Sequence, residues 1–326
     1  MAFDPERIPG VGPAIAEGLT KAGYNSIKSV AVASPSEISA ETGVTSEKAK
    51  DIIEWAREEA NVGGLGGRGP TFEQKSSTAK LSFGVDGVDE LLDGGLETQS
   101  ITEIFGSDGC GRNLIAHRLC VLAQLPIDEG GLAGSAIYID TRNGFDPEIV
   151  SDIVQSLPDD QKTQLADRHG VSLDEIETAV LEDIHVSEAE SVSEQILLAE
   201  DAKSKAESLA NSTDPVRLVC VDTLTDHFKT EFQGRGEMAE RQQKLNKHLH
   251  HLMRLGDLFN TAVVVTNYPG NKANDSFGGS LLSHTATFKL KMLQDSKEKR
   301  TARLVSSPTD RSGEVSFRIV RNSIKP

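Results

Sequence analysis

The chain of 326 residues lacks the features of disulfide-stabilised proteins and of membrane-spanning proteins. Its three cysteines form no C-x-x-C pair, which excludes a disulfide framework and favours a reduced intracellular setting. It has no apolar signal region and no run of about 18 apolar residues. We therefore expect a soluble cytoplasmic protein with no membrane partner. Only 37% of the residues are apolar, but the length allows one large α/β domain and a small one.

Basic residues are also scarce, since 34 lysines and arginines face 50 aspartates and glutamates, for a formal net charge of −16. The acidic surface has two interpretations: it keeps the protein solvated in a salty cytoplasm, or it repels polyanions. The first is favoured because basic residues gather locally, with ten in residues 289–326 against four acids. DNA binding in high salt would then need more than counterion release, because that contribution weakens steeply with salt.

Glycine and proline divide the chain into three parts. Residues 1–60 form a compact helical module, residues 61–79 a glycine-rich linker, and residues 80–326 the large domain. In the large domain apolar strands alternate with helices, which predicts a mostly parallel sheet. The strands are expected at 100–105, 136–140, 216–222 and 261–266, and a helix at 114–124. Residues 182–210 read as an acidic helical stretch on the surface.

Residues 106–113 have the frame of a phosphate-binding loop, with the wrong residues at its two chemically essential positions. In the pattern G-x-x-x-x-G-K-[ST], glycines bring backbone N–H groups around phosphates, the lysine reaches the β- and γ-phosphates, and the hydroxyl holds Mg²⁺. Gly106 and Gly111 are correctly spaced around Gly109, but the lysine position is Arg112 and the hydroxyl position is Asn113. Arginine is bulkier and planar, and asparagine has no hydroxyl. The nucleotide site is therefore predicted to be degenerate.

An acidic strand end and two glycine-containing turns complete the candidate sites. Asp222 ends an apolar strand, as the acid of a nucleotide-binding sheet does. Gly10 and Gly12 lie in a turn with the form of a helix-hairpin-helix, which brings backbone N–H groups to a DNA phosphate or else is only a structural turn. A Gly-Arg-Gly segment around Arg235 opens a polar helix and is either a DNA-contacting loop or an exposed helix cap.

Several segments together resemble the archaeal RadA recombinases of the RecA/Rad51-type family, from about residue 8 to about residue 318. They are Phe83–Leu92, Gly95–Glu103, Tyr138–Thr141, Ala239–His248 and Val263–Asn267. The resemblance implies an α/β fold with a RecA-like P-loop NTPase core, a mostly parallel central sheet and a small all-α helix-hairpin-helix N-terminal domain. Family members form ATP-dependent filaments on single-stranded DNA and exchange strands. The resemblance implies DNA contacts at Gly10, Gly12, Arg235, Arg241 and Lys272.

The chain departs from the family at the positions that handle ATP and join subunits. The catalytic glutamate is replaced by Arg142, which cannot act as a general base, so no catalytic residue is assigned. The sensing glutamine is Tyr268, and the second DNA-binding loop, 268–277, is shorter than the family's. In the polymerisation motif, Leu65 and Arg68 stand where the family has phenylalanine and a small residue, and burying Arg68 unpaired would be costly.

These departures predict a site closed from within. Arg112 and Arg142 are expected to pair with Asp108, Asp140 and Asp222 in an ion-pair cluster. No cofactor and no metal are expected, with ATP and Mg²⁺ as the alternative. The nucleotide-related positions are Gly106, Gly109, Gly111, Arg112, Asn113 and Asp222.

Three functions follow from the resemblance and its departures. The first is a RadA paralogue that binds single-stranded DNA, an intact RadA, or both, and modulates recombinase filaments without hydrolysing ATP; double-stranded DNA is a further possible ligand. The second is an active DNA-dependent ATPase and strand-exchange enzyme in which another acid, such as Glu103 or Asp140, serves as base. The third is a nucleotide-free adaptor that binds a partner recombinase without DNA.

Overall fold

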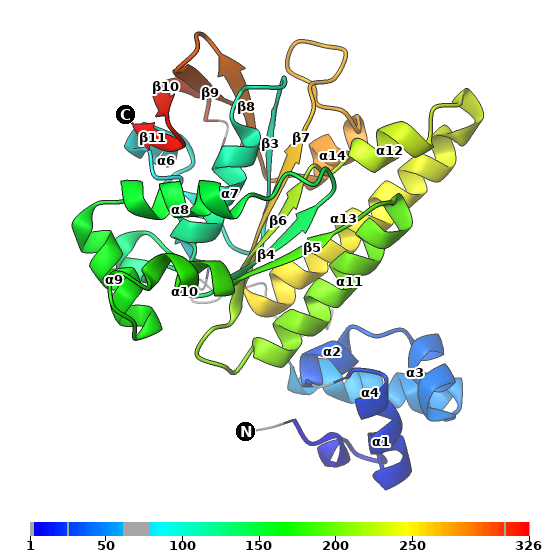
Figure 1. The fold of residues 1–326 in the computed structure, drawn as a ribbon. Coiled ribbons are helices and arrows are strands. Elements are labelled where there is room, and N and C mark those ends of the chain that lie inside the picture. The colour runs from blue at the N-terminus through cyan, green and yellow to red at the C-terminus, as the bar shows by residue number, and fades with distance from the viewer. Residues whose placement is uncertain (1–2, 25, 61–77, 310, 326) are drawn as a thin grey trace. The chain divides into compact units, whose positions relative to one another are not determined.

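A computed structural model of the chain describes residues 3–24, 26–60, 78–309 and 311–325, without the side chain of Arg235 (Figure 1). The chain separates into two compact units, Met1–Ser76 and Ser77–Pro326.

The N-terminal unit consists of short helices around their own apolar core. Ser26 and Ser34 cap two of these helices through reciprocal capping boxes, and Gly43 ends the second of the two in the left-handed conformation. Ile8, Leu19 and Val30 are buried in this core. The helices are η1 (Pro5–Arg7), α1 (Pro13–Lys21), α2 (Ile27–Ala31), α3 (Pro35–Thr42) and α4 (Ser46–Glu59). The helical module expected from the sequence is confirmed.

The C-terminal unit is built on a nine-stranded sheet in the order β11-β10-β9-β8-β3-β7-β6-β4-β5 within the described residues. The six strands from β8 to β5 in this order are parallel, and β9, β10 and β11 continue the sheet antiparallel. The strands are β3 (Ile101–Gly106), β4 (Ser135–Asp140), β5 (Ile184–Glu188), β6 (Val216–Asp222), β7 (Ala262–Asn267), β8 (Phe288–Gln294), β9 (Lys299–Ser306), β10 (Gly313–Val320) and β11 (Ser323–Lys325). A separate antiparallel pair joins β1 (Lys80–Leu81) to β2 (Leu96–Glu97).

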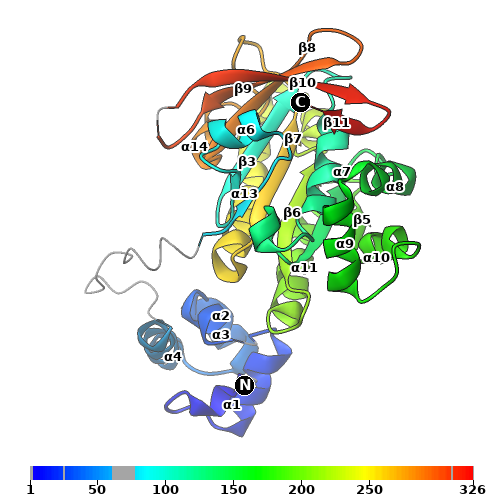
Figure 2. The same ribbon diagram turned by 90° about the vertical axis from the view of Figure 1, so that its left-hand side faces the viewer.

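Helices cover both faces of the parallel strands, which makes a three-layer α/β unit (Figures 1 and 2). The first face carries α7 (Arg112–Leu122), α8 (Pro147–Ser156), α9 (Asp159–His169) and α10 (Ile176–Glu182). The opposite face carries α11 (Val192–Leu209), α12 (Asp226–Glu231), α13 (Met238–Phe259) and α14 (Ser280–Thr285). The remaining helices are α6 (Asp86–Leu91), η2 (Ile127–Glu129) and η3 (Arg235–Glu237).

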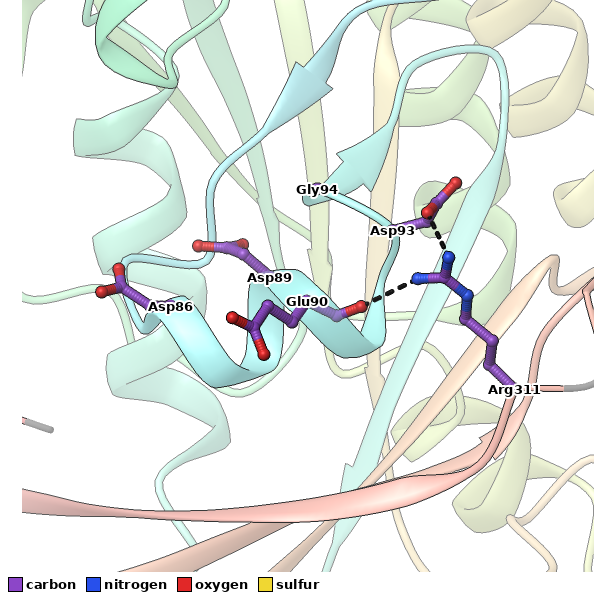
Figure 3. Close-up of a pocket in the computed structure, with 6 residues that line it drawn as sticks. All are labelled: Asp86, Asp89, Glu90, Asp93, Gly94 and Arg311. Carbon is purple, nitrogen blue, oxygen red and sulfur yellow. Dashed lines mark hydrogen bonds and ion pairs between the residues drawn. The ribbon is translucent and has the colours of Figure 1, made fainter.

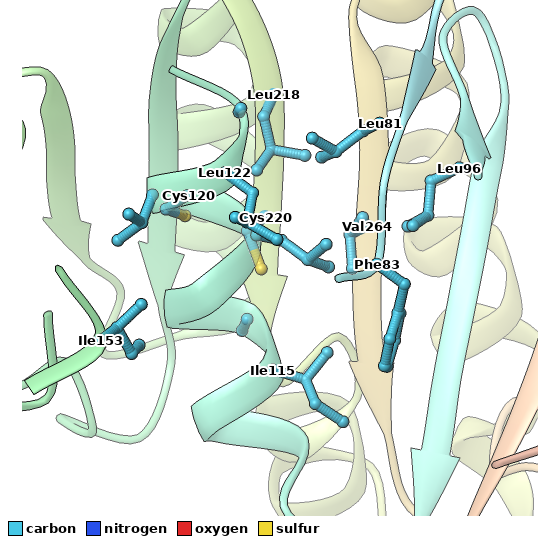
Figure 4. Close-up of a cluster of buried hydrophobic side chains, with 14 of the residues drawn as sticks. Leu81, Phe83, Leu96, Ile115, Cys120, Leu122, Ile153, Leu218, Cys220 and Val264 are labelled. Atoms are coloured by element: carbon cyan, nitrogen blue, oxygen red, sulfur yellow. The ribbon is translucent and has the colours of Figure 1, made fainter. Parts of the chain in front are cut away.

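The strands are buried because apolar side chains project from both of their faces. Figure 4 shows one of the two resulting cores, in which Ile115 and Leu122 of α7 lie near Cys220 of β6 and Val264 of β7. Continuous apolar strands are typical of parallel sheets with helices on both sides. The mostly parallel sheet expected from the sequence is therefore confirmed.

One prediction about secondary structure is partly wrong. Residues 182–210 were expected to form a single acidic helical stretch, but Ile184–Glu188 is the edge strand β5 and only Val192–Leu209 is helical. In β5 only Ile184 is buried, and Val186, on the same face of the strand, is already 37% exposed. An edge strand with one buried side chain among polar neighbours lacks the alternating pattern by which a strand is recognised in a sequence.

Candidate nucleotide and DNA-binding site

The carboxyl ends of four neighbouring strands bring the candidate nucleotide residues together. The phosphate-loop frame follows β3, and Asp140, Asp222 and Asn267 end β4, β6 and β7. Asp140 pairs in register with Asp222, and Phe105 with Asn267, so these ends lie at one edge of the sheet. In open α/β sheets this edge is where ligands bind.

The loop between β3 and α7 keeps the shape that its glycines allow. Gly109 and Gly111 have φ values of 78° and 100°, which disfavour other residues. Strands β8 and β10 cover the loop: a Cβ at Gly111 would lie 2.6 Å from Cδ1 of Ile319, and one at Gly109 would lie 2.9 Å from Oε1 of Gln294. Buried Arg300 donates to the Gly109 carbonyl at 3.0 Å. Nothing in the sequence indicates that these residues cover the loop.

Arg112 is directed into the protein, although it stands where a phosphate lysine is expected. Its side chain is 6% exposed. One guanidinium nitrogen lies 3.0 Å from a carboxylate oxygen of Asp108, and another donates to the backbone carbonyl of Asn267. The guanidinium carbon also lies 4.6 Å from the ring centre of Tyr268, in a cation–π contact. Arg112 therefore joins the phosphate-loop frame to the end of β7.

Asn113 and Asp222 are satisfied by each other and by their neighbours. The Asn113 side-chain nitrogen donates to Asp222 at 3.1 Å and to the Gly144 carbonyl at 2.9 Å. Because both partners are acceptors, the nitrogen rather than the oxygen of the amide faces them. The Tyr138 hydroxyl donates to the same Asp222 oxygen at 2.7 Å, and the Thr266 hydroxyl donates to the other. Burial raises the pKa of Tyr138 well above its usual value, which keeps it a neutral donor.

The expected ion-pair cluster forms only around Asp108. Arg112 and Arg142 approach its carboxylate to 3.0 and 3.9 Å, but neither forms an ion pair with Asp140 or Asp222. Asp140 instead accepts backbone N–H groups of Arg142, Gly144 and Phe145 at 2.8–3.0 Å. That part of the prediction is wrong, because hydrogen bonds from neutral groups already satisfy both buried aspartates.

Further polar groups stabilise the loop after β4. His117 of α7 stacks on Phe145 and accepts the N–H of Asp146 at 3.0 Å. Burial lowers the pKa of His117, so the ring stays neutral and able to accept this bond. Asp146 caps α8 by accepting the N–H of Glu148 at 2.9 Å. These bonds fix the loop that carries Arg142.

The residues of this edge do not fit Mg²⁺ with ATP. A phosphate ligand is needed at position 112, but Arg112 is engaged with Asp108 and Asn267. A metal-binding oxygen is needed at position 113, but Asn113 presents its nitrogen to Asp222. Asp108, 78% exposed in the loop, adds a carboxylate that pairs with Arg112 and Arg142 and so competes with a phosphate for their charge.

The second DNA-binding loop expected from the resemblance is a short hairpin. The N–H of Phe277 donates to the Tyr268 carbonyl at 3.0 Å, and the N–H of Gly270 donates to the Asp275 carbonyl at 2.7 Å. Buried Lys289 donates to the Ser276 hydroxyl at 3.1 Å. Lys272 is exposed in the hairpin loop.

Cations and aromatic rings lie together beside this hairpin. The guanidinium carbon of Arg241 is 5.0 Å from the ring centre of Phe277, and the Lys229 nitrogen is 4.7 Å from that of Tyr268. Rings and cations in one surface are the groups that bind single-stranded nucleic acid. Arg235 begins η3, but its side chain lies outside the described part of the chain. Leu65 and Arg68 also lie outside the described residues.

The N-terminal turn has the geometry for a backbone contact with phosphate. Gly10 has a φ of 79°, and Gly12 caps α1 without a side-chain hydrogen bond. A Cβ at Gly12 would have no neighbour within 4 Å, so the approach to the first turn of α1 is open. Cε of Lys48, on α4, would lie 3.7 Å from a Cβ at Gly10, so this side chain brings a cation to the turn. Sequence reasoning missed Lys48, because it lies far along the chain.

A separate hollow of about 480 Å³ lies on α6 of the C-terminal unit (Figure 3). Asp86, Asp89, Glu90 and Asp93 line it, and Arg311 is bound there to Asp93 and to the Glu90 carbonyl. With its one arginine engaged, this hollow would repel phosphate groups.

Comparisons with known proteins agree with the fold and with the resemblance. The model of the family described as Rad51 matches residues 74–326, and the model described as SAM-like helix-hairpin-helix tandem matches residues 4–58. The DNA repair and recombination protein RadA of Haloferax volcanii is 46% identical, over 99% of this chain and 98% of its own. Proteins of the same name from Haloquadratum walsbyi and Methanoculleus marisnigri are 43% identical (98% of each chain) and 41% identical (99% of each chain). Among the described helices, none is long and apolar enough to cross a membrane.

Proposed function

Because this chain belongs to the Rad51 family, we propose that it is a RadA-like DNA repair and recombination protein that has lost ATP hydrolysis. It binds single-stranded DNA and modulates the filaments of an intact RadA. The observation that carries the loss of hydrolysis is the buried Arg112, whose guanidinium is engaged by protein groups and not free for a phosphate. No cofactor is needed for the proposed role.

The acids that could replace the missing catalytic glutamate are engaged as well. Glu103 is fully buried, lies 3.2 Å from the Lys289 nitrogen and accepts from Asn267 at 2.7 Å. Asp140 is 1% exposed and accepts three backbone N–H groups. A general base must reach the proton that it removes. This engagement favours the loss of hydrolysis over an active ATPase.

DNA contact is proposed at two surfaces. In the N-terminal unit the turn of Gly10 and Gly12 offers backbone N–H groups to a phosphate, with Lys48 beside it. In the C-terminal unit Arg241 supplies a cation beside the Phe277 ring, Lys272 is exposed in the hairpin loop, and Arg235 is proposed from the sequence alone. These contacts distinguish the proposal from an adaptor that has no DNA-binding role.

The proposed partner contact is the open edge of the sheet at β5. No other strand of the described chain pairs with its outer side. Beside it lies a hollow of about 190 Å³ between β4, β5 and α11, with Ile137, Ile139, Leu198 and Ala202 in its wall. An unpaired strand next to an apolar hollow suits an extended segment that adds a strand and inserts one apolar side chain. We assign this segment to the linker of an intact RadA.

Titration with a fluorescent ATP analogue tests the loss of the nucleotide. The measurement is made with Mg²⁺, with and without single-stranded DNA, at high and low potassium, beside a protein with an intact G-x-x-x-x-G-K-[ST] loop. We expect no saturable binding to this chain while fluorescence anisotropy still detects bound DNA. Saturable binding with DNA-stimulated phosphate release would establish the enzyme instead, and loss of both ligands would favour the adaptor.

The partner contact is tested by filling the hollow. Ala202 is 4% exposed, so Ala202→Tyr should block it, whereas Leu197→Tyr changes a 53% exposed position of the same helix. Binding to an intact RadA, measured by surface plasmon resonance, should be lost in the first variant and kept in the second. Equal binding by both folded variants would exclude this edge as the contact.

A further inference from the structure

Asn267 connects the sheet to both ends of the 268–277 hairpin. Its side-chain nitrogen donates to the Phe277 carbonyl at 2.6 Å and to Glu103 at 2.7 Å. Its side-chain oxygen accepts the N–H of Tyr268 at 2.8 Å and the Thr225 hydroxyl at 2.5 Å. Asn267 is fully buried. A group that fixes Asn267 and Tyr268 therefore fixes the hairpin.

Arg112 is such a group, and it comes from the phosphate-loop frame. It contacts the backbone carbonyl of Asn267 and the ring face of Tyr268, while Asp108 holds its other nitrogen. The Tyr268 hydroxyl donates to Asp226 at 2.9 Å, which fixes the ring on its far side. A lysine at position 112 would reach the β- and γ-phosphates of a nucleotide. The arginine instead contacts the base of the hairpin directly, at Asn267 and Tyr268.

We propose that Arg112 is a positioning residue that stands in for the nucleotide: it holds the 268–277 hairpin ready for single-stranded DNA, so that DNA affinity is independent of ATP. This inference rests on the proposed DNA-binding function and deepens it. The planar guanidinium suits this role because it donates in two directions while its face packs on a ring. A lysine ammonium in the same place has no such face.

Arg142 provides a matched control. It carries the same charge beside the same groups, at 3.9 Å from Asp108 and 5.6 Å from the Tyr268 ring centre. Its side chain is 42% exposed, and the described structure gives it no side-chain bond to Asn267. If charge alone held the hairpin, the two arginines would act alike.

Hydrogen exchange of the hairpin amides, measured by mass spectrometry with and without Mg-ATP, tests the proposal without depending on DNA. In the native chain we expect Mg-ATP to change the exchange rates of the hairpin amides by no more than about twofold, which is the effect of a weak surface contact. Arg112→Gln should speed exchange in residues 268–277 by about tenfold or more, as the loss of a charge-assisted hydrogen bond implies. Arg142→Gln should change it by less than about twofold. Equal effects of the two variants, or slower exchange on adding Mg-ATP, would overturn the proposal.

DNA affinity, measured by fluorescence anisotropy in the same samples, separates this inference from the proposed function. Of the two variants, we expect only Arg112→Gln to weaken DNA binding. Mg-ATP should leave the DNA affinity of the native chain unchanged. A native chain that binds no DNA would refute the function, while the exchange data still judge the hairpin. If Arg112→Gln does not fold, Arg112→Lys keeps the charge but loses the planar guanidinium that donates in two directions, and unchanged hairpin exchange in it would refute the proposal.

Discussion

Replacing Lys289 by methionine should strongly destabilise the large unit. The Lys289 nitrogen lies 3.2 Å from Glu103, and the two side chains are 3% and 0% exposed. Removing the lysine leaves a buried carboxylate without its cation, a change that typically costs about 3–5 kcal/mol. Each kcal/mol lowers the melting temperature of a domain of this size by about 2–4 °C, so we expect a fall of roughly 6–20 °C.

Thermal unfolding followed by circular dichroism measures this effect. The control is Lys299→Met, the same substitution at an exposed residue of the neighbouring strand β9, which should stay within about 1 kcal/mol of the native protein. Adding Glu103→Gln to Lys289→Met removes the orphaned charge and keeps an acceptor for Asn267, so it should recover most of the loss. A single variant as stable as the control, or a double variant no better than the single, would refute the reasoning.

Three further predictions concern the nucleotide edge, acid stability and the thiols. Arg112→Lys combined with Asn113→Thr restores the phosphate-loop pattern and should raise Mg-ATP affinity at least about tenfold in analogue titration, unless Ile319 and Arg300 block entry. Burial lowers the pKa of His248 to about 3. In the unfolded state the His248 ring binds a proton near pH 6.5, and in the folded state it does not, so the free energy of unfolding should fall from about pH 6.5 towards pH 3. His248→Gln should reduce the pH dependence of this free energy, measured by denaturant titration, by up to about 1.4 kcal/mol per pH unit. All three cysteines are fully buried, with thiol pKa values raised by burial, so a thiol reagent should label them only on unfolding, and rapid native labelling would contradict the packing.

The parallel part of the fold was predictable because each strand carries its own local signal. The apolar run ending in Asp222 appears at Val216–Asp222, and β4 ends at Asp140 as expected. The edge strand β5 is missed because only Ile184 of its residues is buried and its neighbours are polar or acidic. A local pattern identifies a strand that is buried on both faces far better than a strand at an edge.

The composition does not predict where the charged side chains lie or which residues they pair with. The basic residues of the C-terminal segment are predicted to be a local concentration of charge, but Lys289 and Arg300 serve inside the protein. Lys289 pairs with buried Glu103 and Arg300 donates to the Gly109 carbonyl, whereas Arg318 pairs with Glu298 at the surface. Two of these partners lie more than 180 residues earlier in the chain, so only the folded sheet brings them together.

The candidate site was predictable in its residues but not in the direction of its side chains. Substitution of the phosphate lysine by Arg112 is visible in the sequence, whereas its contact with Asn267 depends on β3 and β7 being neighbours. Tyr268 was recognised as a changed residue, but its role as the surface on which Arg112 lies was not. The sequence shows which functional group a substitution removes. Only the structure shows which residues the new side chain contacts.

The replaced residues satisfy one another, which argues against simple decay of an ATP site. Random loss of function would leave buried donors and acceptors unpaired, and each would cost stability. Instead Arg112 contacts Tyr268, another departure from the family, and Asn113 donates to the retained Asp222. Reverting Arg112 alone would therefore remove a bond and a ring contact without restoring the metal site. The altered residues form one connected arrangement, and this is why the proposed loss of the nucleotide and the proposed role of Arg112 in the hairpin are best explained together.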